Sequence, residues 1–247
     1  MRHARMLPHR SFLSIALALA LAVASAAAAA DWQPTAELGV VNTSGNSDTT
    51  SVNGKFALAG EDALWTHDYY LAALRAESED QLSANRQELG AKAARKLGER
   101  AYLGAAARYE NDDFAAYAYQ ATLAVNYGAW LLKDERREFQ IEGGPGLRRA
   151  ELAETGEAEN EALLRGFADY RHQFTESTRF FNTLLVEAAP DNRFIQNDIG
   201  IAVSINHSLA LKAALQARHN TDVPEGVRRT DTLTSVNIVW TPGGTQD

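Results

Sequence analysis

The sequence predicts an all-β protein, a single antiparallel up-and-down transmembrane β-barrel of about 12 strands after a cleaved signal peptide. Three observations predict this fold. Apolar residues recur at every second position from Thr35 onward. Alternate connections between these segments are short and polar. No segment after the first thirty residues approaches the ~18 continuous apolar residues that a membrane helix needs.

The first thirty residues resemble an export signal. Arg2, Arg5 and Arg10 precede an apolar stretch at 11–24, which is the charge pattern of a signal peptide. Small residues end at Ala30, where cleavage is expected. We therefore expect a signal peptide at 1–30 and the outer-membrane β-barrel domain at 31–247. An uncleaved membrane anchor is the alternative, but its apolar core would be short.

Composition excludes several classes of function. The 247 residues contain 24 Lys and Arg against 32 Asp and Glu, a net charge of −8, so no basic surface for nucleic acid is expected. Zero cysteines exclude a disulfide scaffold, a thiolate zinc site and a cysteine nucleophile. No motif in the sequence points to a cofactor or a metal, and none is expected.

Period-two alternation divides the chain into segments with two unlike faces. In 50–58, Val52, Phe56 and Leu58 share one face, and Asn53 and Lys55 share the other. The expected strands are 35–43, 49–60, 63–77, 85–97, 99–111, 115–131, 136–149, 160–173, 177–189, 193–206, 207–220 and 229–240. Helical spacing fits none of them.

The connections are expected to differ at the two ends of the barrel. Those at 60–62, 97–99, 133–135, 174–176 and 206–208 are tight, whereas those at 78–84, 150–160 and 222–228 are longer. Outer-membrane barrels show this asymmetry, with short turns in the periplasm. Segment 150–161 is also rich in glutamate, which is interpreted as a solvated loop or, alternatively, as ligands that bridge divalent cations to lipid headgroups.

Aromatic residues lie near the strand ends on the apolar face, as the interfacial girdles of a membrane barrel do. They are Tyr109, Tyr117, Tyr119, Tyr127, Tyr170 and Trp240. Asp68 and Asn182 are also assigned to this face. A secreted soluble β-protein remains the alternative, because its strands alternate in the same way.

The opposite face carries charges deep inside the strands, and these side chains are the candidates for lining the lumen. The candidates are Lys55, Arg75, Glu88, Lys92, Arg108, Glu142, Arg165, Asp169 and Lys212. Basic and acidic residues are nearly balanced among the charges that parity assigns inward. Strongly selective pores instead carry rings of one sign, so the pattern predicts a narrow lumen with a mixed charge.

Several motifs resemble a known family. The segment Leu38–Ser51 contains Ser44-Gly-Asn-Ser-Asp48 at the first turn, and later matches are Tyr109–Phe114, Gly143-Gly-Pro-Gly146 and Arg229–Thr232. In order and spacing they resemble the uncharacterised family of salt-induced outer-membrane proteins. The resemblance covers the mature chain and implies a β-barrel in the outer membrane of a Gram-negative bacterium. It implies no activity, ligand or catalytic residue.

Three functions follow as hypotheses. The first is a narrow, porin-like channel for a small solute or ion, and the second is a structural envelope protein whose lumen is plugged by side chains, linked through the family to salt or osmotic response. The third is an outer-membrane enzyme, which we do not expect, because the histidines have no serine partner in the expected topology. The partners expected are outer-membrane lipid, lipopolysaccharide and the barrel-assembly machinery, with no nucleic acid.

Overall fold

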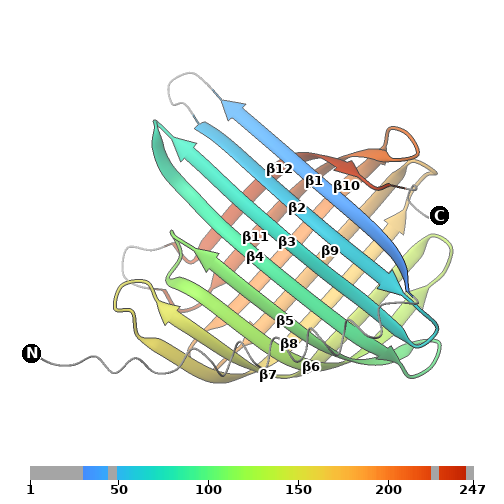
Figure 1. The fold of residues 1–247 in the computed structure, drawn as a ribbon, viewed down its shortest axis with the longest axis horizontal. Helices are drawn as coiled ribbons and strands as arrows, with labels where there is room; N and C mark the ends of the chain where they lie inside the picture. The colour runs from blue at the N-terminus through green and yellow to red at the C-terminus, as the bar shows by residue number, and fades with distance from the viewer. Residues whose placement is uncertain (1–29, 44–48, 224–227, 243–247) are drawn as a thin grey trace, which may run out of the picture.

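A computed structural model describes residues 30–43, 49–223 and 228–242, which form a closed antiparallel barrel of twelve strands (Figure 1). The strands are β1 Asp31–Thr43, β2 Thr49–Glu61, β3 Trp65–Ser78, β4 Gln81–Lys96, β5 Ala101–Asp112, β6 Tyr117–Lys133, β7 Arg137–Leu152, β8 Ala158–Gln173, β9 Thr178–Ala188, β10 Arg193–Ser204, β11 Leu209–Asn220 and β12 Thr230–Trp240. The predicted fold class is confirmed. The expected signal peptide and the Ser44–Asp48 turn lie outside the described residues.

Each strand pairs with its neighbours in sequence, and β1 pairs with β12 to close the barrel. The closing register runs from Ala36 opposite Trp240 to Gly39 opposite Asn237. β1 begins at Asp31, earlier than expected, and its first residues pair with β2 alone. Closure removes the free sheet edges that would otherwise pair with other chains. None of the described residues forms a helix long and apolar enough to cross a membrane.

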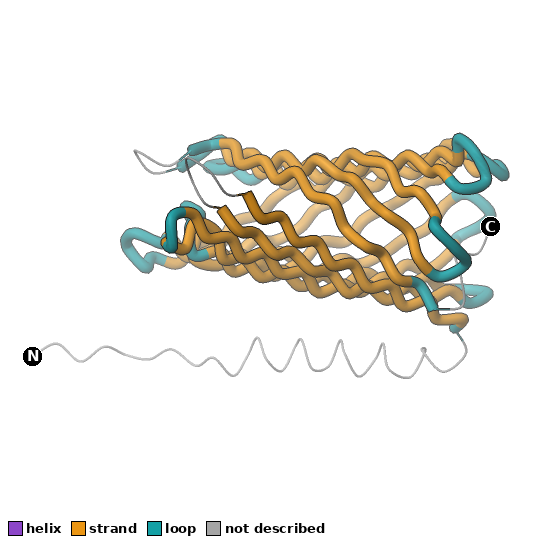
Figure 2. Tube along the Cα trace, turned by 90° about the horizontal axis from the view of Figure 1, so that it is seen from above, coloured by secondary structure: helices purple, strands orange, loops and turns teal. Residues whose placement is uncertain are grey.

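Short connections join the strands at both ends of the barrel (Figure 2). The end that holds the connections 62–64, 97–100, 134–136, 174–177 and 205–208 is called the turn end below, and the start of β1 and the end of β12 lie there too. Asp62, Asp134 and Asn206 each accept two hydrogen bonds from backbone N–H groups that follow them in these turns. Such side-chain turns fix the short connections.

The turn carboxylates are stabilised in their charged form. Hydrogen bonds from the backbone N–H groups of Leu64 and Trp65 lower the pKa of Asp62. The guanidinium of Arg137 and the backbone N–H of Arg136 lower the pKa of Asp134. A lowered carboxyl pKa adds stability at neutral pH, and this contribution is lost as the pH falls through the lowered value.

The expected difference in loop length is largely wrong. β3 and β4 are joined by Glu79 and Asp80 alone, both with positive φ (52° and 59°), the conformation of a two-residue hairpin turn. The glutamate-rich loop expected at 150–160 is also short, because β7 runs to Leu152 and β8 starts at Ala158. The strands continue through these polar stretches because hairpin pairing satisfies their backbone groups whatever the side chains are.

The register decides which face each residue occupies, since residues directly opposite each other share a face. Phe56 lies opposite Leu71, and their side chains are 49% and 55% exposed on the outside of the barrel. Lys55 lies opposite Ala72, which lies opposite Glu88 on the next strand, and these residues face the lumen. Apolar side chains therefore face outward and charged side chains face inward.

Two face assignments from the sequence are wrong. All of β3 is inverted: Arg75 lies opposite Val52 on the outside, and Asp68 lies opposite Lys92 in the lumen. Apolar residues occupy both faces of β3, so alternation alone could not choose between them. Tyr117 is buried inside, because the register of β6 and β7 shifts between Tyr117 and Tyr119. Such a bulge reverses the face of every residue beyond it.

Two inward tyrosine rings lie across glycines on the neighbouring strand. A Cβ atom on Gly90 would lie 2.0 Å from Cε1 of Tyr70, and one on Gly128 would lie 2.2 Å from the ring of Tyr102. Only glycine leaves room for a ring to lie flat against the barrel wall at these positions. The rings thereby fill the lumen without moving the strands apart.

We expect Gly90→Ala and Gly128→Ala to destabilise the barrel by about 1–3 kcal/mol, because the new methyl group must displace a packed ring. Unfolding by urea in lipid vesicles would measure the change. Gly166→Ala is the matched control, since its Cβ would meet nothing within 4 Å. Equal effects at all three positions would contradict the role of the two rings.

Candidate functional site

The structure places eight of the nine lumen candidates on the inner face: Lys55, Glu88, Lys92, Arg108, Glu142, Arg165, Asp169 and Lys212. The ninth, Arg75, lies outside and forms an exposed ion pair with Glu77 over 2.7 Å. The inversion of β3 brings the acid Asp68 into the lumen and turns both Arg75 and Glu77 outward, so the balance of charge in the lumen shifts by one unit toward negative.

A central cluster of Arg108, Glu110, Glu187, Phe194 and Arg218 fills the lumen. Arg108 donates to Glu110 over 2.9 Å and to Glu187 over 2.6 Å. Arg218 donates to the same oxygen of Glu110. The ring centre of Phe194 lies 4.7 Å from the guanidinium group of Arg108 and 5.1 Å from that of Arg218. These contacts join β5, β9, β10 and β11 across the barrel.

Burial makes this pairing necessary. The side chains of the central cluster are almost wholly inaccessible, with Glu110 at 2% and Phe194 at 1% exposure. An unpaired charge at such a position is strongly unfavourable, whereas a paired and hydrogen-bonded one is tolerated. Two arginines share Glu110, and Glu187 balances the second positive charge. The cluster thus closes the lumen while leaving its ionic groups paired.

A second cluster surrounds Glu142 and lies between the central cluster and the turn end. Glu142 accepts hydrogen bonds from Lys92, from Tyr102 over 2.9 Å and from Arg165 over 3.2 Å. The ammonium of Lys92 also lies 5.1 Å from the centre of the Tyr102 ring. One carboxylate therefore holds three side chains from three different strands.

Further pairs line the rest of the wall. Lys212 bonds to Glu37 over 2.7 Å, next to Asn237. At the end opposite the turn end, Arg148 pairs with Glu161 over 2.5 Å and stacks 4.7 Å from the ring centre of Tyr117. Basic and acidic side chains are thus in contact at several points along the described part of the wall.

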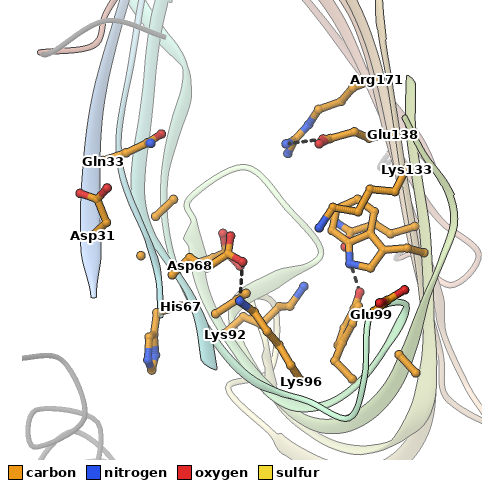
Figure 3. A pocket seen from close by; sticks show the side chains of 18 of the residues that line it. Asp31, Gln33, His67, Asp68, Lys92, Lys96, Glu99, Lys133, Glu138 and Arg171 are labelled. Carbon is orange, nitrogen blue, oxygen red and sulfur yellow. Dashed lines mark hydrogen bonds and ion pairs between the residues drawn. The ribbon is translucent and has the colours of Figure 1, made fainter. Parts of the chain in front are cut away.

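A cavity of about 500 Å³ remains open at the turn end (Figure 3). Asp31, Gln33 and Asp68 lie on one side of it, and Lys133 and Arg171 lie on the other. The Glu142 cluster forms its inner boundary through Lys92 and Tyr102. The barrel is therefore filled in its middle and hollow at one end.

Sequence reasoning missed several residues of this arrangement. Alternation puts Tyr102 and Phe194 on the charged face but does not show that their rings pack among the charges. It assigns Tyr70 to the opposite face, because β3 is inverted. Tyr70 nevertheless donates to Glu88, and Lys55 lies 5.0 Å from the centre of its ring. A glycine directly across the strand pair from a tyrosine is the available signal, as at Gly90 and Gly128.

The histidines do not form a catalytic arrangement. His67 faces outward among the rings of Trp32, Trp65 and Tyr69. His219 bonds to Thr230 over 2.8 Å, and no histidine in the described ranges bonds to a serine. Within the same ranges, no group of three or more acidic or histidine side chains is arranged to hold a metal ion.

The sequence matches, over residues 36–241, the family described as protein of unknown function, DUF481. The chain belongs to this family. The salt response implied by the resemblance is not part of that description and stays a prediction. The sequence matches none of the curated proteins with which it was compared.

Solved outer-membrane barrels share the fold of this DUF481 member. The NanC porin matches with a TM-score of 0.51 and 9% identity, over 85% of this chain and 97% of that one. The COG4313 outer membrane channel from Pseudomonas putida F1 matches with a TM-score of 0.50 and 10% identity, over 86% of this chain and 95% of that one. At these identities the likeness is one of fold.

We expect Glu110→Gln to destabilise the barrel by about 3–5 kcal/mol, because it leaves Arg108 and Arg218 buried without their shared partner. Glu77→Gln, in the exposed pair with Arg75, is expected to cost at most about 1 kcal/mol. Guanidinium unfolding of the reconstituted proteins measures both changes. Similar losses for the two variants would show that burial does not control the contribution of these pairs.

Proposed function

We propose that the protein is an outer-membrane β-barrel of a Gram-negative bacterium that provides a narrow, side-chain-gated path for small solutes or ions. One observation carries the proposal: the chain encloses paired charges and turns its apolar side chains outward. A soluble β-protein would do the reverse, because water favours charge on the surface and apolar groups inside. Lipid favours the arrangement found here.

The side chains on the outer face support the proposed location in a bilayer. Large apolar side chains are exposed around the barrel, for example Leu38, Phe56, Leu89, Leu123, Leu147, Leu164, Ile201, Leu211 and Ile238. Aromatic residues gather outside the turn end, where the rings of Tyr170, His172, Phe174 and Phe180 pack together. Tyr109 and Tyr119 stack at the other end. Aromatic side chains at both ends of an apolar band are what the two interfaces of a membrane favour.

The packing of the lumen supports the proposal of a narrow path that side chains close. In the described part of the chain, side chains and no separate segment fill the middle of the barrel. Ion pairs such as Arg108 with Glu187 can rearrange without unfolding any strand. The porin and the channel that share this fold are consistent with transport, and the mixed charges favour weak selectivity.

A structural role with a permanently plugged lumen is the second candidate. The near-complete burial of the central cluster favours it. Catalysis is not proposed, because no histidine in the described ranges is bonded to a serine nucleophile. The proposed partners remain membrane lipid, lipopolysaccharide and the assembly machinery, since a barrel with this outer face has to be inserted into and held by a bilayer.

The membrane assignment predicts that the protein fractionates with outer membranes. It also predicts a different migration in detergent gels before and after heating, because a closed barrel resists unfolding until it is heated. Cell fractionation and paired gel lanes measure the two properties. Recovery as a soluble periplasmic monomer would falsify the assignment.

The gating proposal predicts a small conductance with weak ion selectivity in planar bilayers. Replacing Arg108 and Glu142 together with alanine removes contacts from both clusters and is expected to raise the conductance several-fold. Arg75→Ala, on the outside, is the control and should leave it unchanged. A large, strongly selective conductance in the unmutated protein would contradict the proposal, and silence of both proteins would support the plugged role.

A further inference from the structure

The cavity at the turn end is built differently from the rest of the lumen. Four charged groups that line it have no ion pair within the described ranges. Asp31 and Asp68 lie on one wall, and Glu99 and Lys133 lie on the other, where Lys133 stacks 5.2 Å from the ring centre of Trp130 (Figure 3). Charged groups of opposite sign that have no ion pair, called uncommitted below, can each pair with a charge on a bound ligand.

The other charges of the cavity are already neutralised. Lys92 bonds to Glu142, Lys96 bonds to Glu61, and Arg171 bonds to Asp169 over 2.8 Å. Glu138 also contacts Arg171 over 3.6 Å. These pairs leave three carboxylates, those of Asp31, Asp68 and Glu99, and one ammonium, that of Lys133. A ligand that completes the pairing therefore carries a carboxylate for Lys133 and more than one positive group for the carboxylates.

The dimensions and the remaining lining suit a small organic molecule. A volume of about 500 Å³ lies within the usual range for ligand pockets. Gln33, Thr66 and Gln140 add groups that both donate and accept hydrogen bonds. Trp130 and Tyr102 supply aromatic faces against which an aliphatic chain or a cation can pack.

We propose that this cavity is a binding site for small basic amino acids, with lysine as the simplest example. The ligand carboxylate lies at Lys133, the α-ammonium on the same carbon lies on that side at Glu99, and the side-chain ammonium lies at the opposite wall formed by Asp31 and Asp68. A metal ion fits less well, because no cluster of three ligating side chains exists among the described residues. An anionic solute is disfavoured because the uncommitted carboxylates outnumber the uncommitted cation.

Calorimetric titration of the folded protein in detergent micelles tests this site with three probes. Lysine carries all three charges, cadaverine lacks the carboxylate, and glutamate carries an excess of negative charge. Lysine is expected to bind at millimolar concentration or below, and more tightly than either of the others. The measurement requires no conductance, so a silent bilayer experiment would leave this inference standing.

Three substitutions locate the site. Asp68→Asn should weaken the binding of both lysine and cadaverine at least tenfold, because it removes one charge-assisted contact without changing size. Lys133→Gln should weaken lysine binding to a similar extent without weakening that of cadaverine, which has no carboxylate. Arg75→Gln, outside the barrel, should change neither.

Folding of each variant is checked by its migration before and after heating, and Asp31→Asn replaces Asp68→Asn if the latter fails to fold. Lysine affinity that is unchanged by the carboxylate substitution would overturn the proposal. Equal binding of glutamate and lysine would also overturn it, as would no detectable binding of lysine to the unmutated protein.

Discussion

Closing twelve strands into a barrel forces one face of every strand into a confined lumen, and in this chain that face is charged. The charges in the buried middle of the lumen need partners of opposite sign, because an unpaired buried charge is strongly unfavourable. Pairs that join distant strands, such as Lys212 with Glu37 and Arg218 with Glu110, follow from this requirement. Because the outer face is apolar and the barrel is closed, the charged side chains lie in the lumen.

Flat rings make this filling compatible with a regular barrel wall. Tyr70 and Tyr102 lie across glycines, and the ring of Phe194 lies close to two guanidinium groups. A ring placed in this way occupies the volume that the arginine and glutamate side chains leave between them. The lumen is thereby packed with polar and aromatic groups together, whereas a soluble protein of this size is packed with aliphatic side chains.

Side chains fill the middle of the barrel more completely than its turn end, and the two regions therefore suit different roles. The middle is packed with ion-paired clusters, which would control passage in the proposed channel, while the turn end keeps a cavity with uncommitted charges, which would suit the proposed recognition of a ligand. The Glu142 cluster lies at the boundary between the two, since Lys92 and Tyr102 contribute to both. A ligand in the cavity would contact the groups that close the path beyond it.

The sequence by itself determined the fold class, the number of strands and the faces of most of them, because period-two alternation is a local property that strand geometry translates directly into two faces. It therefore placed Arg108 and Glu142 in the lumen. Where both faces of a strand are apolar, as in β3, or where a bulge reverses the alternation, as beside Tyr117, local pattern carries no such information. Only the register with neighbouring strands turned Arg75 outward and Asp68 inward. Tertiary structure alone also decided which charges pair, because partners such as Arg108 and Glu187 are far apart in sequence and meet only when the barrel closes.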